Sequence, residues 1–198
     1  MPTSRPSRPA LVVMVKAPRP GRVKTRLAAD IGVIAATSWY RHQTRRLLRN
    51  LRDPRWRVIL AVARDKDPLH AAHWPADLPR IRQGRGDLGQ RMARILRAGL
   101  GQPALIIGSD IPGIGRAEIA DTFTRLQGHD AVIGPSEDGG YWGIGLRCPH
   151  RLPPHAFSGV RWSTCHAMND TLRTLAPLRC ARGLTLRDID RAEDLRRT

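Results

Sequence analysis

A loop rich in positive charge follows the apolar residues 11–15, and four of its cations are candidate phosphate ligands: Lys16, Arg22, Lys24 and Arg26. Such a cluster could neutralise a polyphosphate and stabilise the charge that develops on a departing pyrophosphate. Prolines restrict the loop backbone, and Gly21 allows a ligand to approach it closely. Because the loop joins a predicted strand to a helix, we expect it to bind nucleotide phosphates. The predicted contacts are Lys16, Ala17, Pro18, Gly21, Arg22, Lys24 and Arg26.

Two of these cations, Lys24 and Arg26, are the predicted catalytic residues of the loop, where they would stabilise the leaving pyrophosphate. Thr25 between them is a candidate N-cap of a helix whose dipole adds positive potential at the same place. The loop is not a P-loop, since the residue directly before Lys24 is not glycine. A solvated basic loop without a ligand is the alternative interpretation.

An acidic residue, Asp110, comes directly after the buried apolar run 104–107 and a turn of small residues. In an open α/β sheet this position lies at the edge where ligands bind. Magnesium takes one or two carboxylates from the protein and its other ligands from phosphate and water. We therefore predict Asp110 as a metal ligand, against the alternative of a turn that merely ends the strand.

A second acidic segment joins two predicted strands and carries Glu137, Asp138, Gly139, Gly140 and Tyr141. Two acids, two glycines and an aromatic pair exceed what a simple hairpin turn requires, although Asp-Gly is also a common hairpin sequence. These five residues are the predicted acceptor-binding group, with Asp138 as a further catalytic residue.

Near the end of the chain, Asp188 and Asp190 flank Ile189. Asp190 could provide a second metal ligand, or it could cap a final helix with Glu193 in the capping-box position. The sequence leaves both interpretations open. A glycine-rich turn around Gly86 and Asp87 leads into another helix and is a candidate second wall of the nucleotide site, or only a flexible turn.

Strand signals recur at residues 11–15, 58–63, 104–107, 131–133 and 141–146, with helical stretches between them. The alternation predicts a three-layer α/β/α sandwich around a mostly parallel sheet. Predicted helices cover 25–50 with a break near Gly32, 87–100 with Asp87 as N-cap, 118–126, and 163–175 with Ser163 at its start.

The length of 198 residues suits one domain, predicted over 10–198 after a disordered lead-in at 1–9. The net charge of +17 comes almost entirely from dispersed arginines. Without a basic block or an aromatic ladder, it argues against nucleic acid as a partner and in favour of small anionic substrates. No apolar stretch approaches the ~20 residues of a membrane span. A polar N-terminus and unpaired cysteine spacing predict a cytoplasmic protein.

Taken together, these segments resemble a bacterial glycosyltransferase-A-like family of unknown function, of the rSAM/selenodomain-associated glycosyltransferase type. That family is related to the molybdenum-cofactor and phospholactate nucleotidylyltransferases. The matching stretches occur in family order and span nearly the whole chain: residues 15–27, 86–92, 108–112, 134–146, 162–164 and 188–195.

The resemblance implies a nucleotide-diphospho-sugar transferase (GT-A, Rossmann-like) fold, a nucleotide held by the first loop, and Mg²⁺ or Mn²⁺. It implies metal-binding roles for Asp110 and Asp190, and triphosphate contacts for Lys24 and Arg26. The chain departs from the molybdenum-cofactor enzymes in lacking their Gly-Gly-x-Ser-x-Arg-x-Gly loop, so guanine specificity is not implied. It also has Arg191-Ala192 where Thr-Pro is usual, which puts an identical turn around Asp190 in doubt.

Three functions follow as hypotheses. The first is nucleotidyl transfer from a nucleoside triphosphate to a small phosphorylated or carboxylated acceptor, with release of pyrophosphate. The second is glycosyl transfer from a nucleotide sugar, with Glu137 or Asp138 as base. The third is a non-catalytic protein that binds nucleotides or nucleic acid. The sequence names neither the base nor the acceptor nor the oligomeric state.

Overall fold

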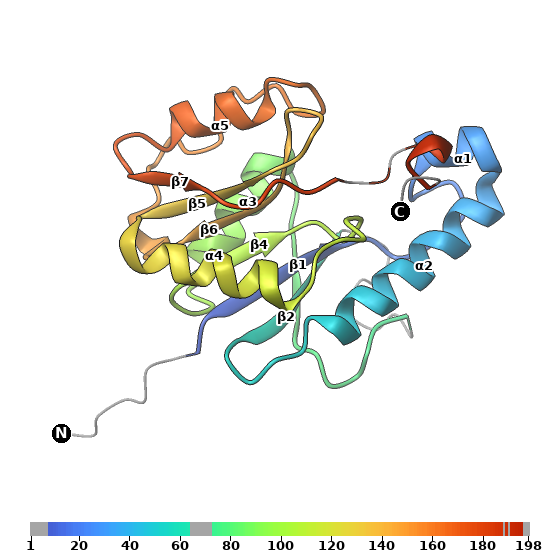
Figure 1. Ribbon diagram of the computed structural model, residues 1–198, viewed down its shortest axis with the longest axis horizontal. Coiled ribbons are helices and arrows are strands. Elements are labelled where there is room, and N and C mark those ends of the chain that lie inside the picture. The colour runs from blue at the N-terminus through green and yellow to red at the C-terminus, as the bar shows by residue number, and fades with distance from the viewer. Residues whose placement is uncertain (1–7, 64–72, 188, 190, 196–198) are drawn as a thin grey trace.

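The computed structural model describes residues 8–63, 73–187, 189 and 191–195, and it is built around a seven-stranded sheet (Figure 1). The strand order across the sheet is β3-β2-β1-β4-β6-β5-β7. Only β6 runs antiparallel to its neighbours, so the sheet is mostly parallel. The strands are β1 (Ala10–Val15), β2 (Arg57–Val62), β3 (Arg80–Arg82), β4 (Ala104–Ile107), β5 (Ala131–Pro135), β6 (Tyr141–Leu146) and β7 (Cys180–Arg182).

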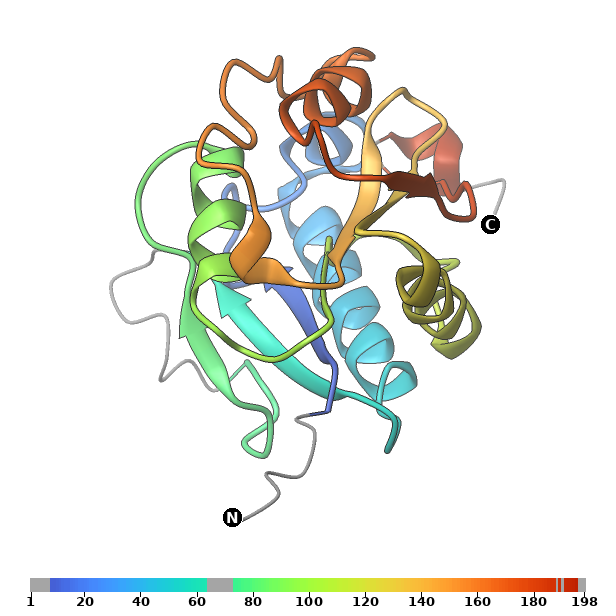
Figure 2. The ribbon, with the colours of Figure 1, turned by 90° about the vertical axis from the view of Figure 1, so that its left-hand side faces the viewer.

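Helices cover both faces of this sheet. They are α1 (Thr25–Ile31), α2 (Val33–Asn50), α3 (Leu88–Arg97), α4 (Arg116–Gly128), α5 (Ala167–Thr174) and α6 (Ala192–Leu195), with a short 3₁₀ turn η1 (Pro149–Arg151). Figure 2 shows the segment after β6 lying beside α3. Figure 1 shows α6 against α1 at the far end of the molecule. The predicted three-layer α/β/α architecture is confirmed.

The period of two along the strands divides the interior into two apolar layers. In β1, Leu11, Val13 and Val15 face the layer that contains residues of α2 and α4. The alternate residues Ala10 and Val12 face a second layer, which contains residues of α3. Such alternation on strands buried on both faces is what holds helices on each side of a parallel sheet.

The chain reverses its direction of travel across the sheet between β1 and β4. After β1 it continues outward through β2 and β3, and it then crosses back to β4 on the other side of β1. At such a reversal the loops after the two strands diverge toward opposite faces, which opens a crevice at their carboxyl ends. The loop after β1 and the turn that carries Asp110 after β4 both begin at this crevice.

Several local expectations are confirmed, and two are wrong. The five predicted strands are present, the helix over 25–50 is divided at Gly32, and Asp87 caps α3. The structure adds β3 and β7, whose three residues each lack an apolar run. Thr25 is not a cap, because Lys24 occupies the N-cap position of α1 without a side-chain capping bond. Nor does a helix begin at Ser163, since α5 begins at Ala167 after His166.

Candidate active site

A cavity of about 510 Å³ opens at the carboxyl ends of β1 and β4, where the chain reverses direction. This volume lies within the range of small-molecule binding sites. The loop after β1, the start of α3, the turn after β4 and the segment before α5 all contribute to the walls. The lining residues are Met14, Val15, Lys16, Val23, Lys24, Tyr40, Gln83, Asp87, Leu88, Arg91, Gly108, Ser109, Asp110, Trp162 and Ser163.

The central contact of this cavity joins the loop after β1 to the turn after β4. Lys24 Nζ lies 2.7 Å from Asp110 Oδ2, and it also donates a hydrogen bond to the carbonyl oxygen of Ile189. The Lys24 side chain is only 6% exposed, whereas that of Asp110 is 38% exposed. The ion pair therefore leaves the carboxylate accessible from the cavity while its partner is largely enclosed.

A buried hydroxyl pair fixes the two strand ends relative to each other. The Tyr40 hydroxyl accepts a hydrogen bond from the backbone N–H of Lys16 at 3.1 Å, and it lies 3.0 Å from the Ser109 hydroxyl. Burial raises the pKa of Tyr40, so its hydroxyl stays neutral at physiological pH. Through this bridge α2 holds Lys16, at the start of the loop after β1, beside Ser109, which precedes Asp110.

Gln83 performs a similar role on the opposite wall. Its side-chain amide donates to the carbonyl oxygens of Ala61 at 2.8 Å and Val15 at 3.3 Å. Its amide oxygen accepts from Arg91 Nη1 at 3.1 Å, which orients that guanidinium at the cavity. A fully buried amide thus spans the ends of β1 and β2 and positions a cation on α3.

Only part of the predicted phosphate loop reaches the cavity. Lys16 and Lys24 line it, while Ala17 and Pro18 are buried beneath the loop. Gly21 has a φ of +72°, a left-handed conformation that favours glycine. Arg22 and Arg26 are exposed and stand outside the lining residues. Their predicted contacts with a nucleotide, and the catalytic role of Arg26, remain predictions.

The predicted second wall is present. Asp87 lines the cavity and caps α3, its carboxylate accepting from the Gln90 N–H at 2.8 Å while Gln90 Oε1 accepts from the Asp87 N–H at 3.2 Å. Gly86 adopts a φ of +105° and lines a neighbouring cleft instead.

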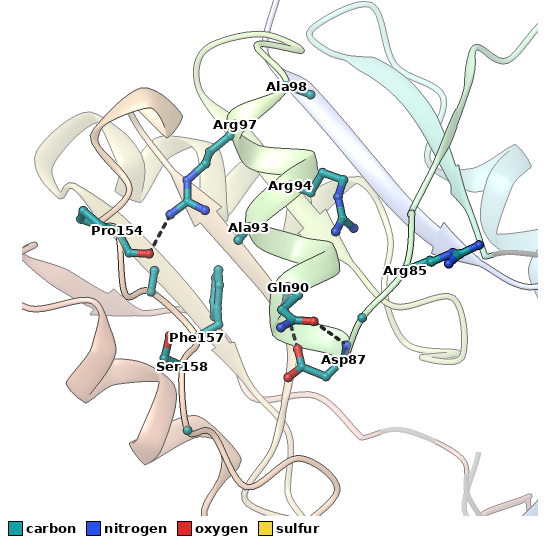
Figure 3. Close-up of a pocket in the computed structure, with 13 residues that line it drawn as sticks. Arg85, Asp87, Gln90, Ala93, Arg94, Arg97, Ala98, Pro154, Phe157 and Ser158 are labelled. Atoms are coloured by element: carbon teal, nitrogen blue, oxygen red, sulfur yellow. Dashed lines mark hydrogen bonds between the residues drawn. The ribbon is translucent and has the colours of Figure 1, made fainter.

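This neighbouring cleft, shown in Figure 3, has a volume of about 1090 Å³ and shares Asp87 with the cavity. Two of its arginines bind neutral partners: Arg94 Nη1 donates to the Gln83 carbonyl at 2.8 Å, and Arg97 Nη2 donates to the Pro153 carbonyl at 2.9 Å. Their charge is therefore not neutralised by these contacts. Positive potential of this kind raises the local concentration of anions near the cavity.

The acidic hairpin between β5 and β6 does not line the cavity. Glu137 is bound by Arg187, and Asp138 Oδ1 accepts from the Gly140 N–H at 2.8 Å within its own turn. Gly139 has a φ of +84° and packs against the backbone of Cys165. The Tyr141 ring lies 6.3 Å from that of Trp162, so the hairpin reaches the cavity wall through one aromatic contact.

The two C-terminal acids, Asp188 and the predicted metal ligand Asp190, both lie outside the described residues. Ile189 between them is buried, and its backbone contacts both members of the central ion pair: its N–H donates to the Asp110 carbonyl at 3.4 Å, and its carbonyl accepts from Lys24.

Asp110 and its surroundings fit a divalent cation. The Asp110 carboxylate and the Ile189 carbonyl present hard oxygen donors beside a cationic cavity. Magnesium is commonly held by one or two carboxylates together with substrate phosphates rather than by a complete protein cage. Consistently, the described part of the chain holds no cluster of three or more His, Cys, Asp or Glu side chains around a common point.

Comparison with known proteins bears on this site. A family model described as an uncharacterized protein conserved in bacteria (DUF2064) matches residues 47–164, which is more than half of the chain. The chain belongs to this family. No curated protein matches it in sequence. The predicted relation to the molybdenum-cofactor and phospholactate enzymes remains a prediction.

Solved structures share the fold. One described as a "putative nucleotide-diphospho-sugar transferase" from Desulfovibrio desulfuricans G20 is 28% identical, with a TM-score of 0.83 over 93% of this chain and 83% of that chain. The 4-diphosphocytidyl-2C-methyl-D-erythritol synthase of Anaerococcus prevotii DSM 20548 is 10% identical, with a TM-score of 0.58 over 96% and 95%.

A third, the glucosyl-3-phosphoglycerate synthase of Mycobacterium tuberculosis, is 11% identical, with a TM-score of 0.54 over 96% of this chain and 74% of that chain. Its structure holds Mn²⁺, uridine diphosphate and glucosyl-3-phosphoglycerate. The fold of this chain is that of the nucleotide-diphospho-sugar transferases, as the motif resemblance implied.

Several residues of the cavity were not predicted from the sequence, above all Tyr40, Ser109, Gln83 and Arg91. Tyr40 and Gln83 carry no local signal, because each is polar within or beside an element and its partners are distant in sequence. Ser109 could have been noticed as the neighbour of Asp110.

In the described residues, no helix combines the length and apolar character that crossing a membrane requires.

Proposed function

We propose that this protein is a metal-dependent nucleotidyltransferase, which transfers a nucleotidyl group from a nucleoside triphosphate to a small phosphorylated or carboxylated acceptor. The cavity that brings Lys16, Lys24 and Asp110 together at the point where the sheet reverses is the observation that carries the proposal. A triphosphate needs both cations and a carboxylate-bound divalent ion in one place. The membership in a family with this fold supports a nucleotide-using transferase.

In this reaction, separate residues of the cavity would bind the phosphates, stabilise the leaving group and hold the metal ion. Lys16 and Arg91 both line the cavity and would bind and orient the phosphates. Lys24 would stabilise the charge that develops on the leaving pyrophosphate. Asp110, joined in our proposal by Asp190, would hold Mg²⁺ or Mn²⁺, which when bound neutralises phosphate charge.

The acceptor would bind on the side of the β5–β6 hairpin. Glu137, Asp138 and the amides of Gly139 and Gly140 lie on this hairpin, and Tyr141 joins it to the wall residue Trp162. An acceptor held here would approach the nucleotide along the wall that contains Trp162. Asp138 would then orient the attacking oxygen or remove its proton.

Glycosyl transfer from a nucleotide sugar is the second candidate, and one observation favours it. Trp162 presents an aromatic side chain to the cavity beside Tyr141, and aromatic faces suit sugar rings. The name of the Desulfovibrio protein also favours this chemistry. In that reaction the same cations would hold a diphosphate leaving group, and no pyrophosphate would be released.

Thermal unfolding in the presence of candidate ligands tests the proposal first. Each nucleoside triphosphate, UDP-glucose and GDP-mannose would be compared with and without Mg²⁺. A ligand at 100 times its Kd stabilises the native state by about 2.7 kcal/mol. A shift that needs both Mg²⁺ and one triphosphate supports nucleotidyl transfer and identifies the base, whereas a shift with a nucleotide sugar alone moves the assignment to glycosyl transfer.

Pyrophosphate release then separates the reactions. The variant Lys24→Ala should reduce the rate of release by roughly a hundredfold or more, because a cation at the leaving group is lost. Near-normal turnover would contradict the role given to Lys24. Binding of random DNA near physiological salt, without any nucleotide-induced shift, would favour the non-catalytic alternative.

A further inference from the structure

The ammonium group of Lys24 is held by oxygen atoms of the kind that a divalent cation also binds. Its contacts include the Asp110 carboxylate at 2.7 Å and the Ile189 carbonyl. Both are hard donors, which suit Mg²⁺ and Mn²⁺ as well as an ammonium. A divalent ion bound to the same two oxygens would require the ammonium to leave.

The backbone and the surroundings of Lys24 place the ammonium there specifically. Lys24 has a φ of 47° and a ψ of 49°, the left-handed conformation that is uncommon for a residue with a side chain. Its Nζ lies 5.9 Å from the centroid of the Trp39 ring, on the side of α2. The side chain is thereby directed inward to Asp110 rather than outward along the exposed loop.

We propose that Lys24 is an exchangeable internal cation, which occupies the metal-binding oxygens until a divalent ion replaces it and the ammonium turns to the nucleotide phosphates. The inference rests on the proposed function and adds to it how the binding of the metal ion and the binding of the nucleotide depend on each other. A divalent ion alone must compete with Lys24 and binds weakly. A phosphate chain offers the ammonium a new partner, so nucleotide and metal ion strengthen each other's binding, as linkage requires.

Titration with Mn²⁺ in the absence of nucleotide tests the exchange directly, with the electron paramagnetic resonance signal of free Mn²⁺ as the readout. Four proteins are compared: wild type, Lys24→Met, Lys16→Met and Asp110→Asn. Lys16→Met is the matched control, because Lys16 lines the same cavity but is exposed and contributes its backbone to the Tyr40 bond. Circular dichroism and thermal unfolding establish that each variant is folded.

We expect the affinity for Mn²⁺ to rise mainly in the Lys24→Met variant. Lys24→Met should bind Mn²⁺ about tenfold more tightly than wild type, whereas Lys16→Met should gain about twofold from the general loss of positive charge. Asp110→Asn should lose the Mn²⁺ site. Equal Mn²⁺ affinities for Lys24→Met and Lys16→Met, with binding still dependent on Asp110, would overturn the exchange and leave the proposed function standing.

A second measurement approaches the exchange from the phosphate side and needs no metal. Tripolyphosphate, which resembles the phosphate chain of a nucleotide, is titrated into wild type, Asp110→Asn, Lys24→Met and the double variant. Asp110→Asn should bind it more tightly, because the ammonium is released, and most of this gain should vanish when Lys24 is also replaced. An equal gain in both backgrounds would reflect charge alone and contradict the proposal.

The failure of the proposed function gives a different pattern. If wild type and Asp110→Asn bind Mn²⁺ with the same affinity, Asp110 is not a metal ligand. The proposed metal site and the proposed exchange are then both wrong. Asp110-dependent binding that is unaffected by Lys24 would overturn only the exchange.

Discussion

The cavity around Asp110 and the hairpin around Asp138 both carry acids at the same edge of the sheet, yet they differ in how those acids are neutralised. Asp110 pairs with a lysine from a loop 86 positions earlier in the chain and remains open to the cavity. Asp138 binds the amide of Gly140 in its own turn, and Glu137 binds Arg187 on the surface.

This difference separates a site assembled by the fold from a turn that satisfies itself. The bond between Asp138 and Gly140 is available as soon as the turn forms, so Asp138 needs no ligand to explain it. The Lys24–Asp110 pair exists only because β1 and β4 are neighbours. A charge pair that the fold must bring together, in a cavity, is the stronger indication of function.

The sharpest test of this comparison is Asp110→Asn against the equally conservative Asp138→Asn. Loss of the Asp110 charge should remove the Mg²⁺-dependent thermal shift with nucleotide and lower turnover by roughly a thousandfold, because the divalent ion loses its carboxylate. Turnover within about threefold of wild type would contradict the metal-binding role of Asp110.

The next effect concerns the core beneath the hairpin. A methyl group at Gly134 would meet the Trp142 ring at 2.2 Å, and Trp142 is buried and donates a hydrogen bond to the Leu184 carbonyl at 2.8 Å. Gly134→Ala should therefore lower the free energy of unfolding by about 2 kcal/mol through overpacking. Chemical denaturation measures this, and the exposed Gly128, with open space around it, provides the control Gly128→Ala.

Asp138→Asn should have a smaller and more selective effect. The amide oxygen of asparagine can still accept from the Gly140 N–H, so the turn should persist. We expect nucleotide affinity within about twofold of wild type and a roughly tenfold lower kcat/KM for the acceptor. Unchanged acceptor kinetics would reduce the hairpin to a structural turn and remove it from the proposed site.

The smallest effect is a pH dependence at the cavity wall. Hydrogen bonds from Arg161 hold the pKa of Asp170 well below its usual range, with a further contribution from Arg173. Arg161 precedes the wall residues Trp162 and Ser163, so this pair helps to position them.

Because the folded-state pKa is depressed, the stabilisation is present above the unfolded value of about 4 and is lost as the pH falls through the folded value. Asp170→Asn should therefore lower Tm at pH 7, and its difference from wild type should shrink in strong acid. A difference that does not change with pH would exclude this ion pair as the cause.

The sequence carried enough information to predict the architecture and several local features. Apolar residues in 11–15 and 104–107 identify central strands, because burial on both faces demands them. The Asp87 cap was predictable because its partner Gln90 lies three residues away. The predictions that Thr25 caps a helix and that a helix begins at Ser163 were wrong, because a hydroxyl residue favours a helix start but does not impose one against the tertiary path of the chain.

The amino-acid sequence specifies the order of the main strands and helices along the chain and the chemical types of the groups that follow β1 and β4. These features can be predicted because the periodicity and composition that specify an element extend over only a few neighbouring residues. The packing of the fold, in contrast, brings Lys24 to Asp110 and lets Tyr40 and Gln83 bridge the strand ends. Those contacts depend on which strands become neighbours, and the packing of the whole sheet determines that.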